Sequence, residues 1–134
     1  MAKLSRGLRL KNPGNIELGD GWEGLSSEQP DRRFCCFDSF VFGCRALLII
    51  LMECFNQGVN TPMKIVRACT GTNDKGYATM LANNLEITPD TEIECTHDNL
   101  LALARAIARH ENGPQADEVI NISIWEQAAD ELDV

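Results

Sequence analysis

The chain has 134 residues, of which 44% are hydrophobic, and a formal net charge of −8 at pH 7. A chain of this length can bury a core without disulfides or metal ions, so we expect one domain over residues 1–134. The negative charge excludes a general nucleic-acid binder, because no basic stripe is present to displace counterions from phosphates. The longest apolar run, residues 46–52, is too short to span a bilayer, and no apolar segment opens the chain. We therefore expect no membrane insertion and no signal peptide.

The six cysteines do not form a disulfide or zinc pattern. Their spacing contains no C-x-x-C pair, and several lie in apolar runs, where a free cysteine behaves as a small hydrophobic residue. We expect reduced thiols, as in a cytoplasmic protein, with raised pKa values that argue against a cysteine nucleophile. The cysteines are Cys35, Cys36, Cys44, Cys54, Cys69 and Cys95.

The N-terminal third of the chain has turn chemistry rather than helical periodicity. Residues 1–11 show no clear period, and Gly7 would interrupt a helix there. The NPGN segment at 12–15 combines a residue that fixes φ with one that permits positive φ, which predicts a tight turn. Apolar residues separated by glycines follow, and then the run FCCF at 34–37. These features predict a small antiparallel sheet over about residues 12–37.

The rest of the chain is predicted to be helical, over about residues 39–130. The central helix is apolar nearly all round, which is typical of a buried helix. The central helix is predicted to run from an N-cap at Asp38, in the pair Asp38-Ser39, to Gly58. A second helix is predicted over 62–70, after a cap at Thr61, and a third over 74–85. A fourth is predicted from a cap at Asp98 or Asn99 to Glu111, and a last one over 115–130. The predicted fold class is thus α+β, mostly helical, with one small N-terminal sheet.

The segment LARAIARHENG at 103–113 is the strongest candidate for an active site. It is an alanine-rich helix that the following Gly113-Pro114 would end, so Glu111 falls in the last turn. A carboxylate there meets the negative end of the helix dipole, an environment that suits a group whose task is to donate a proton. The alternative is that Glu111 is a solvated residue at a frayed helix end.

Other site chemistries find less support in the sequence. The two histidines, His97 and His110, lie in separate elements without clustered carboxylates, so we expect no metal site and no cofactor. The glycines at 19 and 21 lack the rest of a phosphate-binding loop. The remaining possibility is acid–base catalysis by carboxylates. Lysozyme-type sites consist of a helix-terminal glutamate beside a small sheet.

Several short motifs occur along the chain in an order that resembles that of one family of proteins. They are RGLR at 6–9, NPGNI at 12–16, GWEG at 21–24, RFCCFDS at 33–39, GCRAL at 43–47, GVNT at 58–61, Tyr77 and RHENG at 109–113. The pattern resembles a family of small phage and prophage proteins called "structural protein", which opens with R-G-x-R-N-N-N-P-G-N-I and closes with H-E-N-G. The resemblance covers about residues 6–120. Members are similar to lysozyme-like, virion-associated or lysis-associated peptidoglycan hydrolases, and others are virion proteins.

A second resemblance is to the sheet of flagellar-type glucosaminidases, in which N-N-x-F-G-I, W-x-G and F-R-x-Y-x-S occur in this order. Their catalytic glutamate precedes the sheet, whereas here the E-N-G segment follows it, as in a circular permutation. This chain departs from the phage family at Leu10-Lys11, where Asn-Asn is usual, and at Cys69-Thr70-Gly71, where members tend to have W-A-P.

The resemblance implies roles for individual residues. Glu111 would be the general acid, and Glu23 the second carboxylate, with Glu17 and Asp38 as alternatives. Without a second carboxylate, a single-acid transglycosylase is the alternative. Substrate-binding residues would be Asn12, Asn15, Trp22 and Arg9. Each of these has a structural alternative: the asparagines as turn formers, the tryptophan as core, and the arginine as a partner of Glu111 or Asp38. We assign Phe34, Phe37, Phe40 and Phe42 to the core and treat His110 as supporting or exposed.

The expected function is therefore phage-encoded cleavage of peptidoglycan glycan strands, of muramidase or lytic transglycosylase type. The expected partners are glycan strands and other virion proteins. The protein itself is expected in the virion or the host cytoplasm. The alternative is a virion structural protein that keeps the fold as a plug or adaptor without turnover. An inhibitor-type binder has only the acidic charge in its favour.

Overall fold

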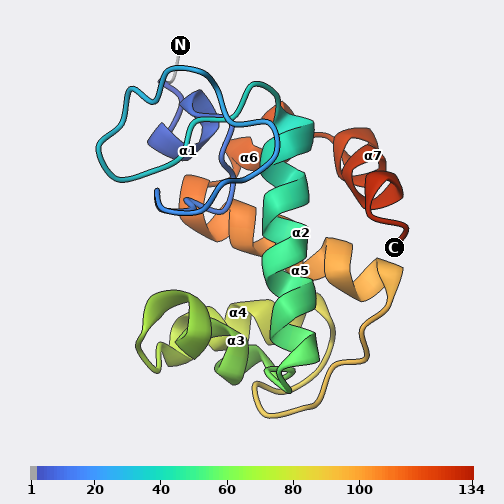
Figure 1. Cartoon of the computed structure of the whole chain (residues 1–134). Coiled ribbons are helices and arrows are strands. Elements are labelled where there is room, and N and C mark those ends of the chain that lie inside the picture. The colour runs from blue at the N-terminus through green and yellow to red at the C-terminus, as the bar shows by residue number, and fades with distance from the viewer. Residues whose placement is uncertain (1–2) are drawn as a thin grey trace.

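A computed structural model describes residues 3–134, and the chain is mostly helical (Figure 1). The helices are α1 (Arg6–Arg9), α2 (Phe40–Asn56), α3 (Pro62–Thr70), α4 (Lys75–Asn84), α5 (His97–Asn112), α6 (Gln115–Val119) and α7 (Ile122–Glu131). The long segment between α1 and α2 is irregular and lies beside the upper part of α2 in this view. This segment, called the N-terminal loop below, covers residues 10–39.

The apolar helix α2 forms the centre of the core. It packs against α3, α5 and α7, and α5 crosses behind it in Figure 1. Most of its buried residues are aliphatic, and Trp125 of α7 is buried in the same core. A smaller core lies between α2 and the N-terminal loop; it contains Phe37 and Ala46. Although α2 is apolar, no helix within residues 3–134 is long and apolar enough to cross a membrane.

The predicted antiparallel sheet over residues 12–37 is wrong. The described residues contain no sheet, and the only pairings of strand type in the N-terminal loop are two isolated antiparallel bridges, Glu17 with Phe34 and Leu25 with Phe37. The backbone of the loop does approach itself as a hairpin would, since the Leu18 amide donates to the Arg33 carbonyl at 2.8 Å. The fold is therefore a helical domain with an ordered loop, not an α+β domain.

Side chains supplement the few backbone hydrogen bonds that cross the N-terminal loop. Asn12 is fully buried, donates to the carbonyls of Ile16 and Cys35, and accepts from the Ile16 amide. Gln29 accepts from the Cys36 amide at 2.7 Å and donates to its carbonyl at 2.9 Å. Because side-chain amides satisfy these backbone groups, the chain keeps an irregular path where the alternation of apolar residues predicted strands.

The N-terminal residues also differ from the prediction. Gly7, expected to interrupt a helix, lies inside α1, which the side chain of Ser5 caps. A β-carbon at Gly7 would collide with the side-chain oxygens of Asn112 and Asn15. The glycine is thus required for close packing of α1 against the end of α5, which outweighs its low helix propensity.

Helix boundaries agree with the prediction in part. Helix α3 spans 62–70 with Thr61 as its cap, as predicted. The cap of α2 is Ser39 rather than Asp38, and the cap of α5 is Thr96 rather than Asp98 or Asn99. Both caps have extended backbone and a hydroxyl that accepts an amide hydrogen bond, which are the properties that define an N-cap.

The helix predicted over 115–130 is interrupted. Helix α6 ends at Val119, Ile120 is extended, and the side chain of Asn121 caps a separate helix α7 by accepting from the Ile124 amide at 3.3 Å. The break lets Ile120 enter the core, where it is 1% exposed. Burial of this side chain and the new cap together favour two short helices over a continuous one.

A histidine ties α5 to the C-terminal residues and makes stability depend on pH. The pKa of His97 is raised, first by a 2.9 Å hydrogen bond to the Val134 backbone carbonyl and then by Glu126 at 2.8 Å. A group whose pKa is raised by folding stabilises the fold fully below its ordinary pKa of about 6.5, and this contribution is lost as pH rises through the raised value. We therefore expect Glu126→Gln to lower the thermal midpoint at pH 6 more than at pH 8.

Thermal melts of both proteins across this pH range check the expectation. The exposed Glu118 of α6 offers a matched control, since Glu118→Gln removes one carboxylate without touching His97. An equal loss at both pH values for Glu126→Gln would contradict the role of His97.

Candidate functional site

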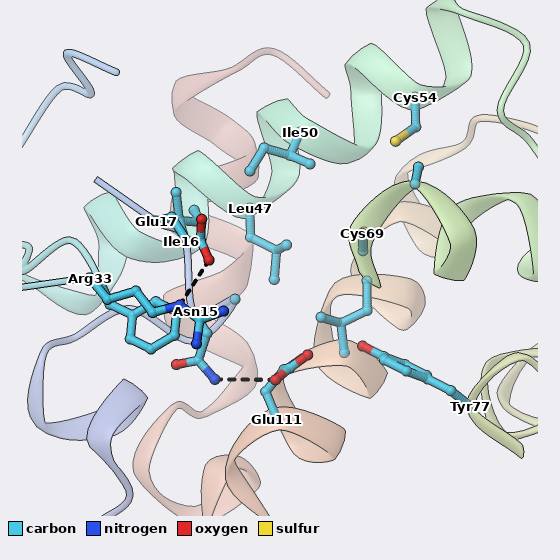
Figure 2. A pocket seen from close by; sticks show the side chains of 14 residues that line it. Asn15, Ile16, Glu17, Arg33, Leu47, Ile50, Cys54, Cys69, Tyr77 and Glu111 are labelled. Atoms are coloured by element: carbon cyan, nitrogen blue, oxygen red, sulfur yellow. Dashed lines mark hydrogen bonds and ion pairs between the residues drawn. The ribbon is translucent and has the colours of Figure 1, made fainter. Parts of the chain in front are cut away.

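A cleft of about 560 Å³ lies between the N-terminal loop and the helices (Figure 2). One wall comes from the N-terminal loop, the floor from α2, and the other wall from α3, α4 and the end of α5. The residues that line it are Gly14, Asn15, Ile16, Glu17, Arg33, Phe34, Leu47, Ile50, Cys54, Ala68, Cys69, Tyr77, Ile107 and Glu111. Its charged lining groups are two carboxylates and one guanidinium, so the cleft has a net charge of −1 and a largely neutral ligand suits it.

Glu111 lies in this cleft, in the last turn of α5. The helix ends at Asn112, and Gly113 has a φ of +85°, a conformation that favours glycine. The side chain of Asn112 donates to the Pro13 carbonyl at 2.9 Å and accepts from the Ser5 hydroxyl at 2.7 Å. The end of α5 is thereby fixed to the N-terminal residues. The carboxylate of Glu111 is exposed to solvent in the open cleft.

Asn15 faces Glu111 from the opposite wall. Its side-chain amide donates to the Glu111 carboxylate, with 3.2 Å between Nδ2 and Oε2, and Figure 2 shows this bond across the cleft. Asn15 has a φ of +49°, a left-handed conformation that asparagine tolerates better than most residues. The turn predicted at 12–15 thus presents one polar side chain to the helix-terminal acid.

Tyr77 forms the wall beside Glu111. Asp74 caps α4 by accepting from the Tyr77 amide at 3.0 Å, which holds the tyrosine in the first turn of that helix. Its ring stacks on His110 with 3.7 Å between centroids, and the residue is 4% exposed. Burial, and next the negative charge of Glu111, raises the pKa of Tyr77, so the hydroxyl keeps its proton at neutral pH.

A second carboxylate lines the cleft at Glu17. Arg33 donates to it, with 2.9 Å between Nε and Oε1, and the guanidinium of Arg33 also lies 4.8 Å from the centre of the Phe34 ring. Both partners are largely exposed, so this ion pair positions the side chains more than it stabilises the fold. Glu17 is therefore the carboxylate that shares the cleft with Glu111.

The other residues proposed from the sequence lie outside the cleft. Glu23 is exposed and pairs with Arg45 at 3.2 Å. Asp38 accepts from the Ser26 hydroxyl at 2.9 Å. Asn12 is buried within the loop, Trp22 packs on the smaller core, and Arg9 donates to the Leu4 carbonyl. Of the four proposed substrate-binding residues, the structure brings only Asn15 to Glu111.

The aromatic residues assigned to the core divide into two groups. Phe34 and Phe37 are buried, whereas Phe40 and Phe42 are partly buried and pack on the larger and smaller core, respectively. His110, expected to be supporting or exposed, is exposed and supports the ring of Tyr77.

The cleft also contains thiols. Cys69 is exposed, yet neighbouring protein atoms desolvate its thiol and, with Cys54 and Glu111, raise its pKa to about 11. Relative to an ordinary thiol pKa of 9.0, this lowers the thiolate fraction at pH 7.5 about 100-fold. All six cysteines are free, and the pKa values of Cys35, Cys44, Cys54 and Cys95 are raised as well.

We therefore expect iodoacetamide to alkylate Cys69 about 100-fold more slowly than glutathione at pH 7.5, with a rate that climbs with pH up to about 11. The tryptic peptide 68–75, followed by mass spectrometry with glutathione as an internal standard, measures this rate. Alkylation as fast as that of glutathione at pH 7.5 would show that the thiol is ionised, and the cleft would then hold a nucleophile.

Residues 3–134 contain no group of three or more histidine, cysteine, aspartate or glutamate side chains arranged to hold a metal ion. Comparison with known proteins identifies no family: neither a protein-family model nor a curated protein sequence matches the chain.

Tyr77 had no predicted role, and Glu17 was expected only as an alternative to Glu23. A signal for Tyr77 was present, because it is the only tyrosine and follows a capping aspartate by three residues. No comparable signal separates Glu17 from Glu23, since both lie in irregular loop whose path depends on long-range hydrogen bonds.

Proposed function

We propose that this chain is a phage-encoded domain that cleaves peptidoglycan glycan strands, with Glu111 as the general acid. The observation that carries the proposal is the position of Glu111: a carboxylate at the end of a buried helix, open to a cleft, and hydrogen-bonded by an amide from the facing wall. The order of sequence motifs from RGLR to HENG, which resembles that of phage lysozyme-like proteins, supports the same function.

In this mechanism Glu111 donates its proton to the glycosidic oxygen as the bond between that oxygen and the sugar C1 breaks. Asn15 holds the carboxyl group by its side-chain amide, 3.2 Å from Oε2. A glycan strand in the cleft would lie against this carboxyl group, which brings the glycosidic oxygen within reach of the proton donor.

Two routes complete the reaction. In the hydrolytic route Glu17 takes a proton from the water that attacks C1, and the product has a reducing end. In the transglycosylase route the sugar's own C6 hydroxyl attacks C1 and gives its proton to the Glu111 carboxylate, which has just lost its own to the leaving oxygen; the product has a 1,6-anhydro end. Glu17 replaces Glu23 as our candidate second carboxylate because it lines the same cleft as Glu111.

The second candidate function is a virion structural protein that retains the fold without turnover. Two observations favour it: Glu111 is exposed in the free protein, and Cys69 lines the cleft within the Cys69-Thr70-Gly71 segment that departs from the family pattern. This candidate predicts an intact cleft that binds other virion proteins and releases nothing from cell walls.

Digestion of purified Gram-negative sacculi distinguishes the two. The proposal predicts loss of turbidity and soluble muropeptides from the wild-type protein, and mass spectrometry of their ends separates the two routes. Absence of soluble fragments from folded wild-type protein would exclude the enzyme and leave the structural role.

A further inference from the structure

The Tyr77 hydroxyl is a buried polar group that has no partner in the free protein. The residue is 4% exposed, and its Oη forms no hydrogen bond of normal geometry within residues 3–134, although the Glu111 carboxylate lies near enough to raise its pKa. Buried hydroxyls are normally paired, because an unpaired one loses its hydrogen bonds to water without compensation. Figure 2 shows the hydroxyl oxygen turned into the cleft, towards Glu111.

The surroundings of Tyr77 fix the ring in this orientation. Its amide is bound to the cap of α4, and one ring face is stacked on His110. Rotation of the hydroxyl away from the cleft would require loss of this stacking. The group is therefore preorganised, with a hydrogen to donate and lone pairs to accept, on a wall that a ligand would touch.

We propose that Tyr77 is a ligand-contacting residue whose hydroxyl obtains its hydrogen bond only when a glycan occupies the cleft. This inference rests on the proposed function. The net charge of −1 in the cleft and the protonated hydroxyl suit a neutral, oxygen-rich group such as a sugar hydroxyl or acetamido carbonyl. His110 acts as a positioning residue, since it contacts the Tyr77 ring.

The variant Tyr77→Phe tests this proposal because it removes only the hydroxyl. We expect binding of a soluble β-1,4-linked N-acetylglucosamine oligomer, measured by calorimetry, to weaken about tenfold, which corresponds to about 1.4 kcal/mol. The thermal midpoint of the free protein should stay the same or rise, because an unpaired buried group has been removed. Loss of affinity without loss of stability is the signature of a hydroxyl reserved for ligand.

The matched control is Thr79→Val, which removes an exposed hydroxyl from the same helix. It should leave both affinity and thermal midpoint unchanged. His110→Ala should weaken binding in the same direction as Tyr77→Phe, because the ring is no longer held by stacking.

The outcomes separate this inference from the proposed function. If the wild type binds the oligomer or digests sacculi, and Tyr77→Phe does so equally well, only the role of Tyr77 is overturned. A clear fall in the thermal midpoint of free Tyr77→Phe, with affinity unchanged, would also overturn it, since the hydroxyl would then have an internal partner. If the wild type neither binds the oligomer nor digests sacculi, both proposals fail.

Discussion

Replacement of Glu111 by glutamine is expected to reduce the release of soluble muropeptides by about 10²- to 10⁴-fold, the usual contribution of a general acid. Glutamine has the size and polarity of glutamate but no proton of suitable acidity to give to the leaving oxygen. The fold should be unaffected, because the carboxylate is exposed and its hydrogen bond is a single one from Asn15. Rates of turbidity loss on sacculi, with circular dichroism as a check of folding, measure both effects.

Two further substitutions of glutamate by glutamine make this experiment specific. Glu23→Gln is the matched control, since Glu23 lies outside the cleft and pairs with Arg45, so the rate should be retained. Glu17→Gln should reduce the rate if the reaction is hydrolytic and leave it nearly unchanged if the sugar's own hydroxyl attacks. Full activity in Glu111→Gln, or a greater loss in Glu23→Gln, would contradict the assignment of the acid.

Replacement of Asn12 by alanine is expected to destabilise the fold by about 3 kcal/mol, a large effect for one polar residue. The substitution removes three buried hydrogen bonds, at 2.9–3.0 Å. It leaves the Cys35 carbonyl and the Ile16 amide without partners, whereas the Ile16 carbonyl keeps its hydrogen bond from the Cys35 amide. Asn12→Asp should be at least as damaging, because a carboxylate oxygen would then face two carbonyl oxygens instead of an amide that donates to them.

Chemical denaturation of Asn12→Ala beside Asn83→Ala measures this difference. Asn83 is exposed on α4, and its replacement by alanine should change the free energy of unfolding by no more than about 0.5 kcal/mol. If Asn12→Ala were as stable as Asn83→Ala, the loop would not depend on the buried amide, and another set of contacts would have to replace the missing sheet.

The helices are the part of the fold that the sequence predicts best, because their signals are local. Thr61-Pro62 and the apolar pattern of α2 define helix starts and a buried face within a few residues. The N-terminal loop is different. Its apolar residues have strand-like spacing, but the amide of Asn12 bonds to Cys35, 23 residues away, and no local pattern shows that a side chain will take the place of a strand.

The site was predictable only in part for the same reason. Glu111 could be found because a helix end and its stop signal occur together in the chain. Its neighbours Asn15 and Tyr77 are 96 and 34 residues away in sequence, and the packing of α4 and the N-terminal loop on α5 decides which side chains meet it. Trp22 and Arg9 had residue types suited to a sugar site, but that packing turns them elsewhere.

The hydrogen bond between Ser5 and Asn112, which fixes the end of α5 to the N-terminal residues, has a consequence for biosynthesis. These two residues are 107 residues apart in sequence. The N-terminal loop, which is synthesised first, therefore cannot pack on the end of α5 until α5 has left the ribosome. A nascent chain thus has no complete cleft until α5 has emerged. Truncation before α5 would abolish the cleft outright instead of weakening it, and any activity of this chain would begin only after α5 has been synthesised.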